Sequence, residues 1–202
     1  DTRGSRVKPG RIGEIWLRGK SVGSGYWGNP EATKEGFGAR LRGNGGPFLR
    51  TGDLGFVEDR GELFIVGRVK DLIIVRGLNY YPSDIEATAE MSWRGLHPGC
   101  SAAFALEGEG TEAAVVICEH DGREAPGGVS WNLVVDAVRG SVAQEHGLSL
   151  DRVVIVSRGQ IPKTSSGKIQ RSLARTRYLE GALEVLYHWK APDREADTPT
   201  VN

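Results

Sequence analysis

The sequence has no net charge, no long apolar run and only two cysteines. Its 202 residues hold 26 Lys plus Arg and 26 Asp plus Glu, which disfavours a generally basic nucleic-acid binder or a polybasic membrane protein. No apolar run approaches the roughly 20 residues that span a bilayer. Cys100 and Cys118 both lie in apolar runs, which is typical of buried thiols in a reducing compartment, so we expect a cytoplasmic protein without a disulfide framework. The chain begins at Asp1 without an initiator methionine or a signal-peptide pattern, which indicates an internal fragment.

Glycine, by contrast, is plentiful. Of the 29 glycines, 17 lie between Gly4 and Gly77, where short strands joined by tight turns are expected. Residues 11–18 and 62–66 are strand candidates, and residues 30–35 are a candidate for a single helical turn. The first part of the chain is therefore predicted to be β-rich.

Beyond residue 77 the pattern becomes that of an α+β domain with the order β-α-β-β-α-β-α. Ser83 and Glu86 form an S-x-x-E capping box, which predicts that a helix begins at Ser83. Apolar spacing predicts helices at 83–93, 130–147 and 168–187, and strands at 100–106, 113–118 and 153–156. The end of the chain lacks apolar periodicity and is expected to be disordered or a linker.

Asp53 lies in the first of three polar segments, residues 50–55, which is expected to form a glycine-flanked turn after a strand. A carboxylate held there could accept two hydrogen bonds from a vicinal diol such as ribose. The alternative is a turn carboxylate that bonds its own backbone, which from these residues alone is the commoner arrangement.

Arg68 lies in the second segment, residues 67–77, in which charged residues bracket an apolar strand. Its fork of donors suits a ribose or phosphate oxygen. The alternative is a solvated cluster of salt bridges at a joint between two units, which the short, charged run 67–71 also suits.

Lys168 lies in the third segment, where a Gly-Lys pair follows a hydroxyl-rich loop and opens a predicted helix, as in phosphate-binding turns. It is not a Walker A loop, because Pro162 and Ile169 stand where glycine and Ser or Thr are needed. No acidic residue occurs from 157 to 179, so the local charge favours a polyanion such as ATP or nucleic acid. Nucleic acid is disfavoured because no RNP-type aromatic pair or zinc-finger spacing accompanies the charge. The alternative is a mobile basic loop.

The four histidines show no metal-ligand spacing among themselves or with the cysteines. We therefore expect no metal site within this sequence.

Taken in order, these segments resemble the adenylate-forming superfamily of acyl- and aryl-CoA synthetases, peptide-synthetase adenylation domains and luciferases. The resemblance rests on five ordered motifs at 13–19, 24–31, 50–54, 67–71 and 162–168. Residues 70–86, 97–104 and 161–171 are similar to fatty-acyl-AMP ligases in particular.

The resemblance implies an α+β fold in two parts. Residues 1–69 correspond to the last, β-rich part of a large N-terminal region, and residues 70–189 to a small mobile C-terminal domain. Residues 190–202 are left as a disordered tail or linker. The phosphate loop, the acyl tunnel and most adenine contacts of such enzymes belong to sequence that is not included here.

The resemblance also implies roles for individual residues. Lys168 matches the catalytic lysine that reaches the substrate carboxylate and the α-phosphate, where its charge would stabilise the transition state. Asp53 and Arg68 match residues that bind the ribose of the nucleotide, and Lys70 and Asp71 mark the hinge. ATP and Mg²⁺ are the implied cofactors, with the metal ligand expected outside this fragment.

Fatty-acyl-AMP ligases convert a fatty acid and ATP to acyl-adenylate and pyrophosphate, and then pass the acyl group to an acyl carrier protein of a polyketide or peptide synthase. The expected partners are thus a fatty acid and the phosphopantetheine thiol of a carrier protein, and this fragment alone should be inactive. One alternative is a fragment of a fatty-acyl-CoA ligase. The other is a non-catalytic docking domain derived from such a ligase, against which the joint presence of Asp53, Arg68 and Lys168 argues.

Overall fold

A computed structural model describes residues 4–106, 113–122, 128 and 130–192 of the chain. The chain divides into two compact units at the bond between Lys70 and Asp71. The described residues of these units form four α-helices and ten strands, and a short 3₁₀ helix, η1 (Val69–Asp71), spans the division. The expected α+β class is confirmed.

The first unit is a four-stranded antiparallel sheet built on one long strand, β3 (Asn44–Val57). Its partners are β1 (Gly13–Leu17), β2 (Ala39–Leu41) and β4 (Leu63–Arg68). The helix α1 (Pro30–Phe37) begins with proline at its first position, and the Asn29 side chain accepts a hydrogen bond from the backbone N–H of Ala32. The predicted strands near 11–18 and 62–66 and the helical turn at 30–35 are confirmed.

The first unit buries little apolar surface. Phe48 is the buried hydrophobic side chain among its described residues, whereas Trp27 and Ile65 are 103% and 66% exposed. A sheet gains most of its stability from a covered apolar face. The described strands of this unit therefore leave most of their apolar side chains only partly covered.

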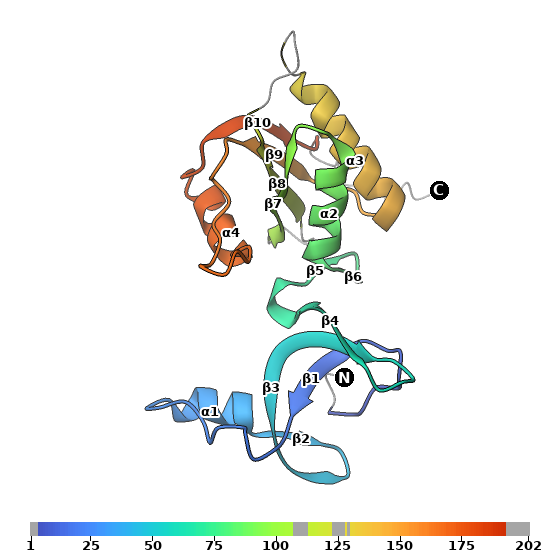
Figure 1. Cartoon of the computed structure of the whole chain (residues 1–202), viewed down its shortest axis with the longest axis vertical. Helices are drawn as coiled ribbons and strands as arrows, with labels where there is room; N and C mark the ends of the chain where they lie inside the picture. Colours follow the sequence, from blue (N-terminus) through green and yellow to red (C-terminus); the bar gives the residue numbers. More distant parts are fainter. Residues whose placement is uncertain (1–3, 107–112, 123–127, 129, 193–202) are drawn as a thin grey trace, which may run out of the picture. The chain divides into compact units, whose positions relative to one another are not determined.

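The second unit is a four-stranded sheet with helices on both faces (Figure 1). Its strand order is β10 (Val185–Lys190), β9 (Arg152–Val156), β8 (Ala113–His120) and β7 (Leu96–Leu106). Only β8 and β9 are parallel, as the crossover through a helix requires. A hairpin of β5 (Ile73–Val75) and β6 (Leu78–Tyr80) precedes the sheet.

Two helices, α2 (Pro82–Ser92) and α3 (Trp131–His146), cover one face of this sheet, and α4 (Arg171–Leu179) covers the other. In α3 the buried residues Val134, Val135, Val138 and Val142 fall at helical spacing, and Gly147 at φ 65° ends the helix by donating to the carbonyl of Ala143. The predicted helix from Ser130 to a stop at Gly147 is confirmed, as are the strands at 100–106, 113–118 and 153–156.

The prediction of a single last helix over 168–187 is wrong. The helix α4 covers only nine residues, and Gly181, at φ 67°, turns the chain after its end. The residues that follow form β10, which pairs with β9 at the sheet edge. Leu183 and Leu186 satisfy helical spacing with Leu179, but the glycine between them breaks the helix.

The capping-box prediction at Ser83 is also wrong. The residue before α2 is Tyr81, Pro82 takes the first helical position, and no side chain caps the helix. Glu86 does not reach back to the helix start, because its side chain is buried and bonded elsewhere in the unit.

Both cysteines are free and buried, as expected. Among the described residues no helix is long and apolar enough to cross a membrane. Of the tail predicted at 190–202, Lys190 is the last residue of β10, and residues 193–202 lie outside the described part.

Candidate functional site

Asp53 and Arg68 form an ion pair in the first unit. They stand opposite each other on β3 and β4, and Arg68 Nε donates to Asp53 Oδ1 at 3.0 Å. The Asp53 side chain is 35% exposed and that of Arg68 63% exposed. Because an exposed ion pair adds little to stability, about 0–1 kcal/mol, the pair is free to exchange partners with a ligand.

The expectation that Asp53 lies on a turn is wrong. Residues 50–55 continue through β3, because β1 pairs with one edge of this segment and β4 with the other. Gly52 is needed here, since its φ of 74° lies in the left-handed region. The Asp53 backbone N–H donates to the Thr51 hydroxyl rather than to its own carboxylate, so the alternative of a self-bonded turn carboxylate is not what the structure contains.

A second ion pair, Glu14 with Arg50, lies in a cleft of about 460 Å³ in the same unit. Arg68 and Lys70 also line this cleft. Burial raises the pKa of Glu14, but hydrogen bonds from Arg50 and Trp16 outweigh burial and hold the pKa below its ordinary value. The cleft is thus lined by side chains of both charges, with cations in excess along the β4–η1 end.

Lys168 lies on a tight, exposed turn in the second unit. The strand-like bridge between Lys163 and Ile169 closes the turn, and the Thr164 N–H donates to the Lys168 carbonyl at 2.8 Å. The Thr164 hydroxyl accepts from the Lys168 N–H at 3.1 Å, and Gly167 takes a φ of 82°. The backbone around Lys168 is therefore defined by hydrogen bonds.

Buried carboxylates hold both ends of this turn. At its start, the Ile161 N–H donates to Glu119 Oε1 at 2.6 Å. At its end, Arg171 donates to both oxygens of Glu86, each at 2.7 Å, and its Nη1 lies 3.4 Å from Asp71 Oδ2. Glu86 also accepts from the Ala103 N–H of β7 at 2.9 Å, which ties the turn to the sheet.

The structure thus brings Asp53 and Arg68 together, places Lys70 at the neighbouring cleft, and links Asp71 to the helix that follows Lys168. Lys168 belongs to the second unit. The sequence predictions missed Glu86, Glu119 and Arg171, which hold the Lys168 turn, and the Glu14–Arg50 pair, which lines the cleft. For Glu86 the signal was misread as a helix cap. Glu14, Arg50 and Arg171 were visible only as charged residues within named motifs, and no sequence signal pointed to Glu119.

Comparisons with known proteins all point to the same class of protein. The family model described as "Disco-interacting protein 2-like, AMP domain" matches residues 70–188. The medium-chain-fatty-acid–[acyl-carrier-protein] ligase JamA of Moorena producens is 48% identical over 187 residues, covering 92% of this chain and 31% of JamA. The long-chain-fatty-acid–AMP ligase FadD26 of Mycobacterium tuberculosis is 43% identical over 178 residues, covering 84% of this chain and 30% of FadD26.

The fold matches solved structures of the same class. The structure of McyG A-PCP complexed with phenylalanyl-adenylate superposes with a TM-score of 0.68 at 30% identity, covering 87% of this chain and 26% of that one. The fold and these matches define an adenylate-forming protein. The chain belongs to the Disco-interacting protein 2-like AMP-domain family. It spans less than a third of the length of JamA and FadD26.

Proposed function

We propose that these residues form part of a fatty-acid–AMP ligase. The intact enzyme joins a fatty-acid carboxylate to the α-phosphate of ATP, which gives acyl-adenylate and releases pyrophosphate. It then transfers the acyl group to the phosphopantetheine thiol of an acyl carrier protein and releases AMP. JamA is named as a fatty-acid–[acyl-carrier-protein] ligase and FadD26 as a fatty-acid–AMP ligase, which supports this choice of substrate and acceptor.

The observation that carries the proposal is the way in which the fold holds and exposes Lys168. An exposed ammonium at the tip of a hydrogen-bonded turn, held at both ends by Glu119 and Glu86, is a preorganised positive charge. Such a charge stabilises a phosphoryl transition state without reorganising at the moment of reaction. We assign Lys168 the role of neutralising the carboxylate and α-phosphate as they react.

Asp53 and Arg68 are proposed to bind the ribose of the nucleotide. The Asp53 carboxylate accepts hydrogen bonds and is partly exposed, so a ribose diol can displace Arg68 from it or share it. Arg68 would then donate to the ribose oxygens from the opposite strand. The adenylate bound in McyG A-PCP supports a nucleotide as the ligand of this class.

Lys70 and Asp71 are proposed as the hinge for a rotation of the second unit. The chain divides between these two residues, and only the three-residue helix η1 spans the division. Asp71 is linked to Arg171, which follows the Lys168 turn, so a rotation about 70–71 carries that turn with the second unit. Such a rotation would withdraw Lys168 after adenylation and admit the thiol.

Mg²⁺ is proposed to accompany ATP, but Glu14 and Asp53 of the first unit are poor candidates for its ligands. Glu14 and Asp53 are each ion-paired with an arginine, whereas Mg²⁺ is bound through carboxylates and water. We therefore assign no residue of this chain to the metal.

The test is the Lys168→Ala substitution in an intact enzyme that contains this chain and is as long as JamA or FadD26. Activity is measured by fatty-acid-dependent ATP–pyrophosphate exchange. The expected loss is on the order of 10²- to 10³-fold, by analogy with the removal of one transition-state donor. Arg158→Ala, which removes another exposed cation of the same basic stretch, is the matched control and should retain activity. Near-normal exchange by a folded Lys168→Ala enzyme would refute the proposed role.

The acceptor is tested separately with ATP, a long fatty acid, and either CoA or a carrier protein that bears phosphopantetheine. We expect efficient acylation of the carrier protein and poor turnover with CoA. Because the thiol is the same in both acceptors, the discrimination must come from a poor fit for the CoA nucleotide, from docking of the carrier protein, or from a bias in domain closure. Efficient acyl-CoA formation would favour the fatty-acyl-CoA ligase instead.

A further inference from the structure

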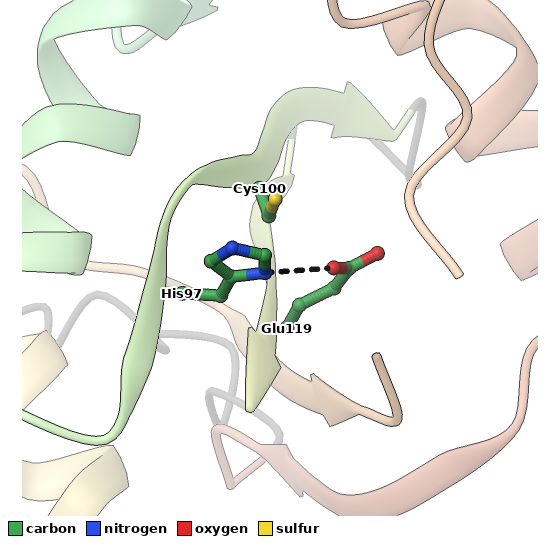
Figure 2. A group of neighbouring side chains, drawn as sticks. All are labelled: His97, Cys100 and Glu119. Atoms are coloured by element: carbon green, nitrogen blue, oxygen red, sulfur yellow. Dashed lines mark ion pairs between the residues drawn. The ribbon is translucent and has the colours of Figure 1, made fainter. Parts of the chain in front are cut away.

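Three side chains with metal-binding atoms point toward one another at the start of the second unit's sheet. They are His97 and Cys100 of β7 and Glu119 of the adjacent strand β8 (Figure 2). The imidazole nitrogen, the thiol sulfur and a carboxylate oxygen all lie within 4.8 Å of one another. Neither the histidine–cysteine spacing nor the isolated glutamate predicts this cluster from the sequence.

An irregularity in strand pairing creates the cluster. Leu96 pairs with His120 and Ser101 pairs with Cys118, so the four residues 97–100 of β7 stand opposite Glu119 alone. Gly99, at φ 68°, allows the sharp bend within this bulge. The bend turns both His97 and Cys100 toward the single opposing carboxylate.

The cluster contains a buried nitrogen, His97 Nδ1, that has no hydrogen-bond partner among the described residues and lies beside a buried carboxylate. The Glu119 side chain is only 3% exposed, and its Oε1 is occupied by the N–H of Ile161. Its Oε2 lies 3.5 Å from His97 Nδ1, which is itself buried and has no hydrogen-bond partner. A buried carboxylate and a buried unpaired nitrogen are costly, and a shared cation would satisfy both.

A cation already lies against the sulfur. Lys163 Nζ is 3.0 Å from Cys100 Sγ, while the cysteine itself is buried. Burial raises the pKa of the Cys100 thiol, and the lysine opposes that shift while the Glu119 charge adds to it. Lys163 is exposed and flexible, so its ammonium can leave the sulfur to a competing ion.

We propose that His97, Cys100 and Glu119 form a binding site for a divalent transition-metal ion, Zn²⁺ by preference. Nitrogen, sulfur and oxygen ligands together suit Zn²⁺, and three protein ligands leave the fourth tetrahedral position to water. Ligand atoms around tetrahedral Zn²⁺ stand about 3.4 Å apart, so side-chain adjustments within the cluster suffice. The partly exposed His97 marks the side from which the ion enters. This assignment does not rest on the proposed acyl-activating function, although Glu119 also holds one end of the Lys168 turn.

The test is Zn²⁺ titration of the 202-residue chain against a chromophoric chelator, with Co²⁺ absorption as a second readout. We expect one ion per chain and a thiolate-to-cobalt charge-transfer band. Cys100→Ser and Glu119→Gln should each weaken affinity by on the order of tenfold to a hundredfold or more, because removing a ligand costs at least as much as removing a group that orients one. Circular dichroism verifies that each variant is folded.

Two further variants separate this site from general thiol or surface binding. Cys118→Ala removes the other buried cysteine and should leave Zn²⁺ affinity and the cobalt band unchanged. Lys163→Met removes the competing ammonium and should tighten binding. Binding of less than one ion, loss of the band in Cys118→Ala, retention of it in Cys100→Ser, or no gain in Lys163→Met would overturn the assignment.

Discussion

Replacing Arg171 by methionine tests how the Lys168 turn is held. Methionine keeps most of the apolar length of the side chain but removes both hydrogen bonds to Glu86. The Glu86 side chain is 9% exposed and that of Arg171 22% exposed, so the variant leaves a largely buried carboxylate whose remaining described contact is the N–H of Ala103. Removing one partner of a buried ion pair costs about 3–5 kcal/mol, and the partial exposure of Arg171 places this case near 3 kcal/mol.

Urea denaturation of the second unit, followed by circular dichroism, measures the loss. With a denaturant slope of about 1–3 kcal/mol per molar, the midpoint should fall by about 1–3 M. The matched variant Glu86→Gln keeps an acceptor for the Ala103 N–H but carries no charge. If the cost in Arg171→Met comes from the uncompensated charge, the double variant should be more stable than Arg171→Met alone.

Two results would refute this reasoning. The first is a change of under about 0.5 kcal/mol in Arg171→Met, which would place the pair among exposed ion pairs of little worth. The second is a double variant whose destabilisation equals the sum of the two single losses, which would show that Glu86 and Arg171 act independently.

Three other outcomes are expected. Burial raises the pKa of Glu14, but hydrogen bonds from Arg50 and Trp16 outweigh burial, so the pKa of Glu14 in the folded chain lies below its ordinary value of 4.5. The ionised Glu14 carboxylate therefore stabilises the folded state above that pH. The stability difference between the natural chain and Glu14→Gln, measured by thermal unfolding, should therefore narrow as the pH falls below about 4.5, and a difference that widens would contradict the pairing. Limited proteolysis should cut first within residues 67–71, and cleavage confined to sites inside the second unit would count against a hinge there. The 202-residue chain alone should show no fatty-acid-dependent ATP–pyrophosphate exchange, since it spans about 31% of JamA; robust exchange would show that the chain is sufficient for adenylation.

The local sequence was enough to predict those helices and strands for which apolar spacing and end signals agree. Four valines at helical spacing and a glycine stop defined α3, because burial of one face and the left-handed freedom of Gly147 act over a few residues. The apolar runs of β7, β8 and β9 were equally readable, since strands buried in a sheet covered on both faces are continuously hydrophobic. The resemblance of five ordered motifs then identified the class of protein, which the family match confirms.

Tertiary pairing decided what the local signals left open. Glu86 resembled a helix cap, but its carboxylate binds a partly buried arginine from a segment 85 residues away. Asp53 resembled a turn residue, but strands on both edges of β3 kept its segment extended. Residues 185–187 resembled the end of a helix, but they belong to β10, which pairs with the edge of β9. The grouping of His97 and Cys100 with Glu119 arose only from a shift in strand register. In each case the deciding contact joins residues far apart in sequence, and its free energy exceeds the small local preferences that a sequence pattern reports.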